Sequence, residues 1–271
     1  MSDIRFCSPE AGDIPALKAL WRRVFGDSGA ITDSFFRAFF DPRLTAVAKG
    51  GEDVAAMAYV IPAGEYTSPG ESFSAAMIYA VACAPEYEGR GYGTAVTERA
   101  CALAGRAGFE SVILHPANEG LFRFYERMGF ATGFYVNRAA VQPADSGDIA
   151  LRDLTVGEYA LLRERLIGDR PHIRMDIRAL EYQQRLCALC GGGMVAVDLH
   201  GQDAGCLIYE GQGGELTVKE YLCPLPPERV AGLISRGVVD FRLYAGEGGG
   251  ARPFAMYRGR PCGGYCSLVF D

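Results

Sequence analysis

No stretch of the sequence approaches the roughly 18–20 consecutive apolar residues that a helix needs to span a bilayer. The first residues, MSDIRFCSPEAGD, also lack the basic segment and apolar run of a secretory signal peptide. Positive charge is not in excess either: the net charge is −6 at pH 7, and an acidic surface repels the phosphates of nucleic acids. We therefore expect a cytoplasmic protein that binds neither membranes nor nucleic acids.

The bulk composition is that of a soluble protein with a packed core. Hydrophobic residues make up 49% of the 271 residues and charged residues 22%, which is the usual balance of a globular domain. The length is enough for one large domain or two ordinary ones. The acidic balance is compatible with a cationic, amine-bearing substrate.

The nine cysteines are an odd number, spread along the chain. In a reducing cytoplasm such residues are mostly small, buried apolar side chains. The pairs Cys187/Cys190 and Cys262/Cys266 are spaced like zinc ligands, so a four-thiolate site is an alternative. However, the two pairs are far apart in the sequence, and the first pair falls in a helix-like run. We expect no metal site.

The first half of the sequence alternates helical and extended patterns. Apolar residues at helical spacing predict a helix over 13–25, with Asp13 as its N-cap and Pro15 in its first turn. The polar, breaker-rich stretch 142–148 marks a domain boundary. Between them the patterns predict strands over 44–49 and 54–62 around a hairpin turn at 50–53, an extended run over 72–83, helices over 93–107 and 118–128, and strands over 112–114 and 134–141.

The second half repeats this order of elements. Residues 148–166 resemble residues 3–24: each has a short strand, a turn and an amphipathic helix, the second opened by a capping box of Thr155 and Glu158. This weak internal repeat predicts two related units in tandem, each an α/β fold with a mixed sheet. An unrelated α+β second domain is the alternative. The later elements are predicted as strands over 195–199, 205–209, 215–223, 238–244 and 265–270 and a helix over 227–234.

The strongest chemical signal is the glycine-rich loop that follows the extended run ending at Cys83. Gly89, Gly91 and Gly93 precede a predicted helix, and consecutive N–H groups at a helix start form a positively polarised nest that can bind a diphosphate. Glycine lets phosphate oxygens approach the backbone without meeting a Cβ. A nucleoside-triphosphate loop is excluded because no Gly-Lys-Ser/Thr follows, and the spacing is wrong for a dinucleotide fingerprint. A plain strand–turn–helix connection would need one glycine, not three.

This loop and a second motif resemble the GCN5-related N-acetyltransferase (GNAT) family. Residues 88–93, Glu-Gly-Arg-Gly-Tyr-Gly, are similar to the pyrophosphate loop of that family, Gln/Arg-x-x-Gly-x-Gly/Ala. Residues 81–85, Val-Ala-Cys-Ala-Pro, resemble the strand end before it. Asn118 and Tyr125 stand at the spacing of the family's second motif, N-x-x-A-x-x-x-Y-x-x-x-G-F. The resemblance covers residues 3–140.

With the internal repeat, the resemblance implies a GNAT fold with two GNAT-like units in tandem. The catalytic unit that binds acyl-CoA would span residues 1–142, and a degenerate unit over 148–271 would shape the acceptor site. In the second unit the strand ending at Leu222 is followed by Cys-Pro-Leu-Pro-Pro, and prolines have no N–H to offer a phosphate. We therefore expect no cofactor there, and residues 256–259 resemble a relic of the Tyr125 region.

The resemblance implies acetyl-CoA as the cofactor. The residues that would bind it, by position in the motifs, are Val81, Ala82, Cys83, Glu88, Gly89, Arg90, Gly91, Tyr92, Gly93, Thr94 and Asn118. Glu88 departs from the Gln or Arg of the family, and its carboxylate repels a diphosphate, although solvent weakens the repulsion. We therefore expect reduced affinity for the same cofactor.

The mechanism implied by the family is direct attack of an amine on the thioester. Backbone N–H groups near Val81 and Cys83 would bind the thioester oxygen, and Tyr125 would act as the acid. A phenol pKa of about 10 exceeds a thiol pKa of about 8.5, so full proton transfer to the thiolate is uphill by about 2 kcal/mol. Tyr125 would then mainly donate a hydrogen bond to the leaving sulfur. The alternative is that Tyr125 is an amphipathic core residue.

The sequence leaves the general base open. Some family members carry a glutamate on the strand before the loop, and Met77 occupies that position here. His115 is a candidate because histidine titrates near neutrality, with a structural histidine at a strand end as the alternative. Tyr79, Glu65, the terminal carboxylate of Asp271 and a chain of waters are further options.

These observations predict an N-acetyltransferase that moves the acetyl group of acetyl-CoA to a primary amine of a small molecule or peptide. The alternative is a non-catalytic acyl-CoA-binding sensor or protein-interaction module. Met77 and Glu88 favour this alternative, whereas Tyr125 and Asn118 disfavour it. A homo-oligomer is compatible with the sequence.

Overall fold

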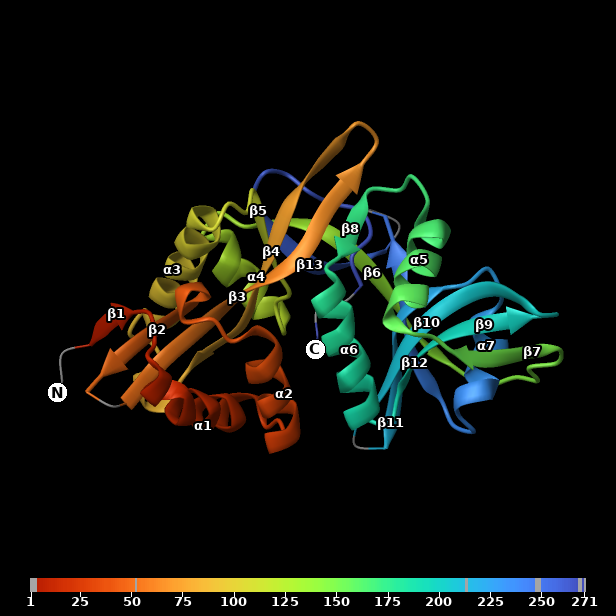
Figure 1. Cartoon of the computed structure of the whole chain (residues 1–271), viewed down its shortest axis with the longest axis horizontal. Coiled ribbons are helices and arrows are strands. Elements are labelled where there is room, and N and C mark those ends of the chain that lie inside the picture. Colours follow the sequence, from red (N-terminus) through yellow and green to blue (C-terminus); the bar gives the residue numbers. More distant parts are fainter. Residues whose placement is uncertain (1–3, 52, 213, 247–249, 268–269, 271) are drawn as a thin grey trace. The chain divides into compact units, whose positions relative to one another are not determined.

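The computed structural model divides the chain into two units (Figure 1). It describes residues 4–51, 53–212, 214–246, 250–267 and 270. The first unit contains the described residues up to 65, then 73–131 and 256–262; the second contains 66–72, 132–255 and the described residues from 263 on. Each unit therefore combines segments that are distant in the sequence.

The first unit is built on a mixed sheet with the strand order β1-β2-β3-β4-β5-β13. The pairs β1/β2, β2/β3 and β5/β13 are antiparallel, and β4/β5 is parallel. Its elements are β1 (Arg5–Cys7), α1 (Ile14–Phe25), α2 (Gly29–Phe39), β2 (Thr45–Gly50), β3 (Asp53–Ser68), β4 (Glu71–Cys83), α3 (Tyr92–Arg106), β5 (Ser111–Leu114), α4 (Glu119–Glu126) and the end of β13 (Arg252–Gly259).

Alternation along the central strands assigns side chains to the two faces of this sheet. Ala56, Ala58 and Val60 of β3 share a buried core with residues of α3 and α4. Tyr59 points to the opposite face, as strand geometry requires, and packs on Trp21 of α1 with 5.8 Å between ring centroids. The helices α1 and α2 therefore cover one face of the sheet, and α3 and α4 cover the other.

The second unit has the strand order β6-β12-β11-β10-β9-β7. Val195, Leu207 and Val218 of its strands share a core with Val230 of α7, while α5 and α6 contact β9 and β10. Two helices thus belong to one face and one helix to the other, whereas the first unit has two helices on each face. The elements are β6 (Ala131–Val141), β7 (Ile149–Asp153), α5 (Val156–Ile167), β8 (His172–Met175), α6 (Ile177–Leu189), β9 (Gly193–Leu199), β10 (Gln202–Gln212), β11 (Glu215–Leu222), α7 (Pro227–Ile234) and β12 (Val239–Ala245).

The second unit therefore repeats the first, as the sequence predicted, but its repeat is shortened. The capping box of Thr155 and Glu158 opens α5, just as expected. Only six residues, 246–251, separate β12 from β13. These are fewer than the eight residues of α4, so the helix that carries Tyr125 in the first unit has no room for a counterpart.

The C-terminal strands of the two halves are exchanged. Residues 256–259 of β13, near the end of the chain, pair antiparallel with β5 of the first unit. β6, which follows the first half, pairs antiparallel with β12 of the second unit. The two units are therefore not continuous in sequence, and the domain ranges 1–142 and 148–271 stay a prediction.

Two predictions for the C-terminal region are wrong. Among the described residues of the predicted strand 265–270, only Tyr265 pairs, in a single bridge to His172, and β13 is the last strand of the described part of the chain. Residues 256–259 are a strand of the first unit rather than a relic of the Tyr125 region, because their partner is β5. Residues 268–269 lie outside the described residues, and so does Asp271, whose terminal carboxylate is one of the candidate bases.

The predicted elements of the first half are found with shifted ends, but α2 was missed there, as were β8 and β13 in the second half, where α6 was predicted only as a helix-like run around Cys187. α2 begins at an N-cap, Ser28, whose hydroxyl accepts from the N–H of Ile31 at 3.3 Å. Its buried residues include Phe35 and Phe39. The predicted hairpin turn at 50–53 includes residue 52, which lies outside the described part of the chain.

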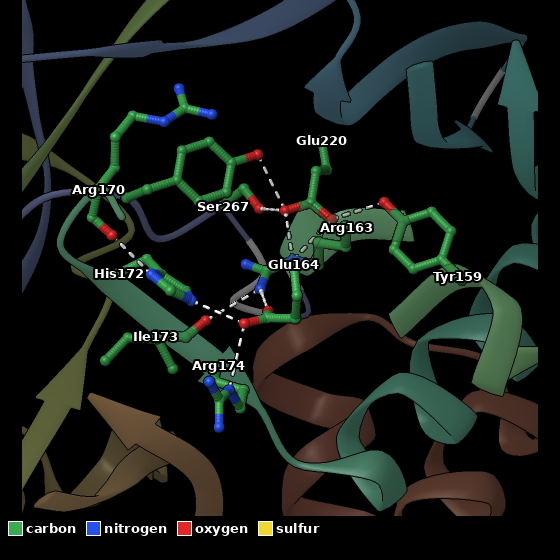
Figure 2. A network of polar contacts seen from close by, with 10 residues as sticks. Tyr159, Arg163, Glu164, Arg170, His172, Ile173, Arg174, Glu220 and Ser267 are labelled. Carbon is green, nitrogen blue, oxygen red and sulfur yellow. Dashed lines mark hydrogen bonds and ion pairs between the residues drawn. The ribbon is translucent and has the colours of Figure 1, made fainter. Parts of the chain in front are cut away.

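A buried carboxylate lies inside the second unit (Figure 2). Glu220 of β11 is 0% exposed and accepts hydrogen bonds from the hydroxyl of Tyr159 at 2.6 Å and from Nε of Arg163 at 3.0 Å. The hydroxyls of Tyr265, at 2.9 Å, and Ser267 also donate to it. A buried charge requires such partners, so this network fixes β11, α5 and residues 265–267 to one another.

A second carboxylate, Glu164, extends the network to β8 (Figure 2). It accepts from Nη1 of Arg163 at 3.0 Å and Nε of Arg174 at 3.2 Å, and it lies 2.9 Å from Nε2 of His172. Burial opposes ionisation, but the hydrogen bonds and charges of His172, Arg163 and Arg174 outweigh it and lower the pKa of Glu164. The network thus joins four segments of the second unit.

We predict that Glu220→Gln destabilises the protein strongly, because Nε of the buried Arg163 loses its charged partner and only Glu164, at Nη1, remains. Removing one partner of a buried pair costs about 3–5 kcal/mol. Urea unfolding followed by circular dichroism measures the loss. Glu181→Gln, which breaks an exposed 3.9 Å pair with Arg185 in the same unit, is the control and should change stability much less. Equal losses in the two variants would contradict the role of the network.

Candidate active site

β4 and β5 are parallel partners over only three residues. Residues 75–77 pair with 111–113, and β5 then ends at Leu114 while β4 continues to Cys83. On that edge, residues 78–83 have no ladder partner in β5. This edge of β4 is therefore open toward β5 at the end of the strand.

Ala80 interrupts the alternation of side chains between the two faces of the sheet in this part of β4. Its φ of 48° lies in the left-handed region, which costs an alanine about 1–2 kcal/mol. Before it, Ala76 and Ile78 belong to the core shared with α3 and α4; after it, Val81 and Cys83 pack against that core. The irregularity thus directs the side chains of Val81 and Cys83 toward α3 and α4. Such strained residues concentrate at functional sites.

The loop between β4 and α3 is shaped by glycines and exposed. Gly89 and Gly91 have φ values of 72° and 80°, and Gly91 is the N-cap of α3. Gly93 has an ordinary backbone, and a Cβ at its position would meet nothing within 4 Å. The packing of the chain therefore does not explain why residue 93 lacks a side chain. The first N–H groups of a helix have no partner inside it, so those of α3 are available to a ligand.

Aromatic contacts hold the loop in place. Tyr92, the first residue of α3, packs edge-on against Phe6 of β1 with 6.0 Å between centroids and lies 6.1 Å from the ring of Tyr87. The guanidinium of Arg90 lies over the Tyr87 ring at 5.5 Å. Glu88 is exposed, so its charge is screened by solvent. Burial raises the pKa of the Cys83 thiol, and the charge of Glu88 adds to this effect.

The helix α4 presents the second motif. Asn118 is its N-cap, and the side-chain oxygen accepts from the N–H of Leu121 at 3.2 Å. Gly129, with a φ of 81°, follows the helix and turns the chain toward β6. The motif therefore sets both ends of this short helix, which explains its spacing in structural terms. Asn118 is exposed, and its placement beside a cofactor stays a prediction.

Tyr125 lies in the same buried core as Val96 and Ala100 of α3, with Val81 and Cys83 packed against that core. Its side chain is 6% exposed. Its ring meets Phe124 at 5.0 Å and Phe130 at 5.7 Å, both edge-on. Burial, with a smaller contribution from the neighbouring thiol of Cys101, raises the pKa of Tyr125 to about 12. The phenol is therefore held firmly in its protonated, hydrogen-bond-donating form.

The candidates for a base are dispersed over the first unit. His115 directly follows β5 and is half-buried. Met77 is buried at 1% exposure, and Tyr79 lies on the face covered by α1 and α2, 5.7 Å from the ring of Trp21. Glu65 lies on β3 and is exposed. The assignment of a general base to any of them stays a prediction.

Residues 5–133 match the family model described as an acetyltransferase (GNAT) domain. Residues 5–133 therefore form a GNAT acetyltransferase domain. The predicted family and enzyme class are thereby confirmed: the domain is that of N-acetyltransferases, which are acetyl-CoA-dependent acyltransferases. No curated protein matches the sequence.

Several solved structures resemble the GNAT chain over nearly its whole length. A GCN5-related N-acetyltransferase from Kribbella flavida is 20% identical, with a TM-score of 0.68 over 95% of this chain and 71% of that one. Eis1 from Mycobacterium abscessus is 16% identical, with 0.64 over 95% and 74%. A tandem GNAT protein from the clavulanic acid biosynthesis pathway is 13% identical, with 0.58 over 95% and 98%. At such identities the likeness shows the fold, a GNAT domain followed by a second GNAT-like region.

Two features near Tyr125 were missed by the sequence analysis. Arg258 of β13 donates through Nη1 to both carboxylate oxygens of Glu98 on α3, at 2.9 Å each. Cys101, one turn further along α3, adjoins this pair. No local motif marks either residue, because Arg258 reaches α3 only through the pairing of β13 with β5. A search for contacts between distant segments could have found it.

A metal centre and a membrane span are the other kinds of site to consider in the described part of the chain. Within it, no group of three or more His, Cys, Asp or Glu side chains is arranged to hold a metal ion. The nine cysteines are free thiols, among them Cys187 on α6 and the buried Cys262. Among the helices of the described residues, none has the length and apolarity needed to cross a bilayer.

We predict that the phenol of Tyr125 stays protonated at pH 10.5, because burial raises its pKa to about 12. Since the folded-state pKa exceeds the unfolded value of about 10, this group's contribution to stability is complete below pH ~10 and is lost as the pH rises through ~12. An NMR titration of ring-labelled tyrosine, assigned with Tyr125→Phe, measures the midpoint against N-acetyltyrosinamide. A midpoint near 10 in the folded protein would show that Tyr125 is solvated.

Proposed function

We propose that the protein transfers the acetyl group of acetyl-CoA to a primary amine of a small molecule or peptide. The observation that carries this proposal is the loop from Glu88 to Thr94 at the start of α3. Gly89 and Gly91 turn the backbone, and Gly93 leaves open a space that the chain's own packing does not require. A helix start with consecutive N–H groups suits a diphosphate, which fits the cofactor of the GNAT family.

Residues of β4 and the loop have the properties needed to hold this cofactor. When bound, acetyl-CoA supplies the thioester, with its electrophilic carbon and its thiol leaving group. The N–H groups of α3 from Tyr92 to Thr94 would hold the diphosphate, and N–H groups on the edge of residues 78–83 that lies beyond β5 would polarise the carbonyl oxygen. Glu88 weakens this binding only modestly because it is exposed.

Tyr125 would stabilise the leaving group mainly as a hydrogen-bond donor. Its pKa of about 12 exceeds that of a thiol, about 8.5, by more than three units. Full transfer of its proton in this environment is therefore uphill by roughly 5 kcal/mol. A donor that stays protonated and desolvated still gives a strong bond to developing negative charge. We therefore propose that the thiolate gains its proton late in the reaction or from solvent.

The amine must lose a proton before it attacks. For an amine with a pKa of about 10, this costs about 4 kcal/mol at pH 7. Met77 cannot accept a proton, so the proposed routes are His115 at the end of β5 or a chain of waters. The acidic protein, with its net charge of −6, favours the approach of a cationic amine.

We further propose that the second unit holds no cofactor and shapes the acceptor site. α7, which follows β11, has Pro226 at its N-cap and Pro227 in its first turn, with no side-chain cap. Proline has no N–H, so this helix start cannot form the nest that Gly91 opens in α3. The short connection between β12 and β13 leaves no room for a second Tyr125 helix.

The alternative function is a sensor that binds acyl-CoA and never turns it over. The observation favouring it is Met77, which stands where some family members carry a glutamate that acts as the general base. A panel of diamines, amino acids, amino sugars and short peptides tests both proposals, with thiol release and product mass as readouts. We expect acetylation of at least one amine class, and a fall in kcat of ~10²-fold or more in Tyr125→Phe with acetyl-CoA affinity retained. Binding without turnover across the panel would establish the sensor instead.

We predict that Gly91→Val weakens acetyl-CoA binding at least about tenfold. Valine is strained at a φ of 80°, so the loop must change shape, and its side chain enters the space proposed for the diphosphate. Calorimetric titration measures the dissociation constant. Gly105→Ala is the control, since Gly105 lies later in α3 with an ordinary φ and no atom within 4 Å of the added Cβ. An unchanged constant in Gly91→Val would remove the loop from the binding site.

A further inference from the structure

Arg258 reaches the first unit from the far end of the chain. It lies on β13 opposite Val112 of β5, in the antiparallel pairing that brings residues 256–259 into this sheet. Two residues earlier, Met256 is fully buried in the same core cluster as Tyr125 and Phe130. The C-terminal strand is therefore part of the unit that holds the proposed catalytic tyrosine.

On one side, Arg258 is bonded to α3, the helix that opens at Gly91. Its Nη1 donates to both carboxylate oxygens of Glu98 at 2.9 Å, and its side chain also hydrogen bonds with the thiol of Cys101. The pair borders a cavity of about 330 Å³. The guanidinium is thus held by the carboxylate of Glu98 on the side where it borders the cavity.

On its other side, Arg258 lies against the end of α4. The guanidinium is 5.9 Å from the ring centre of Phe130, and its Nε lies 3.9 Å from where a Cβ of Gly129 would stand. Phe130 in turn packs edge-on against Tyr125 at 5.7 Å. Cys101, the other neighbour of Arg258, also influences the phenol of Tyr125 electrostatically. Arg258 thus contacts two residues that both act on Tyr125.

We propose that Arg258 is a positioning residue for acetyl transfer. By bridging Glu98 and Cys101 of α3 to Phe130 at the end of α4, it holds the ring of Tyr125 in one orientation relative to the loop that opens α3. It acts through these neighbours and not on the substrate. This inference rests on the proposed function of Tyr125, and it assigns the C-terminal strand a direct part in the first unit's chemistry.

The kinetic test compares Arg258→Ala with a matched arginine on the same segment. We expect Arg258→Ala to lower kcat about 10- to 100-fold while the KM for acetyl-CoA changes less than about threefold, since only the orientation of the donor is lost. Arg258→Lys keeps the charge but not the two-oxygen contact, so it should recover part of kcat. Arg260→Ala is the control: Arg260 pairs with Glu110 at 2.9 Å and covers Phe73, and kcat should be unchanged.

Combining Arg258→Ala with Tyr125→Phe tests whether the effect passes through the tyrosine. In the Tyr125→Phe background, Arg258→Ala should change kcat less than about twofold. An equal loss in both backgrounds, or a change in KM alone, would overturn the proposal. The same holds if Arg260→Ala matches Arg258→Ala.

A readout that needs no acceptor separates this inference from the proposed function. The ring signals of Tyr125 in NMR spectra of the full-length protein should shift in Arg258→Ala and in Arg258→Lys, and stay in place in Arg260→Ala. Unchanged Tyr125 signals in folded Arg258→Lys and Arg258→Ala would overturn the positioning role. Absence of turnover by the wild-type protein with every amine would instead contradict the proposed function and leave this measurement intact.

Discussion

The three-residue contact between β4 and β5 is the constraint on which the candidate site depends. A parallel partner over 75–77 holds the middle of β4 in the sheet, and beyond residue 77 β4 has no partner in β5, while β3 remains its neighbour on the other edge. The left-handed turn at Ala80 then changes the face to which side chains point, and Gly89 and Gly91 complete the path into α3. The segment 78–94 thus contains both the edge of β4 that lacks a partner in β5 and the N-terminus of α3.

The unit that contains this segment is completed by the end of the chain. β13 occupies the edge of β5 opposite to β4, and its Met256 enters the core that surrounds Tyr125. The residues that follow β13, including Tyr265 and Ser267, are held by the buried Glu220 of the second unit. The second unit therefore has a structural task in addition to its proposed role at the acceptor site. It anchors the chain on the C-terminal side of a strand that the first unit needs.

Local sequence patterns predicted much of this fold but not its long-range pairing. The glycines, Asn118 and Tyr125 follow spacing rules that operate within a few turns of chain, so the loop and α4 were predictable. The helix α2 was missed although Phe35, Phe36, Phe39 and Phe40 stand at the spacing of an amphipathic helix. The conformation of Ala80 was hidden because alanine rarely adopts a positive φ. The pairing of β13 with β5 joins residues more than 140 positions apart, and no local signal in either strand specifies the other.

The central claim is that residues 78–94, from the open edge of β4 to the start of α3, bind the cofactor. The start of α7, where Pro226 and Pro227 stand, does not. Calorimetric titration of the full-length protein with coenzyme A, combined with hydrogen exchange of the complex, tests this claim most directly. The account predicts one coenzyme A per chain, with new protection centred on residues 81–94 and none at the start of α7. Two sites per chain, or protection centred on residues 223–230, would contradict it.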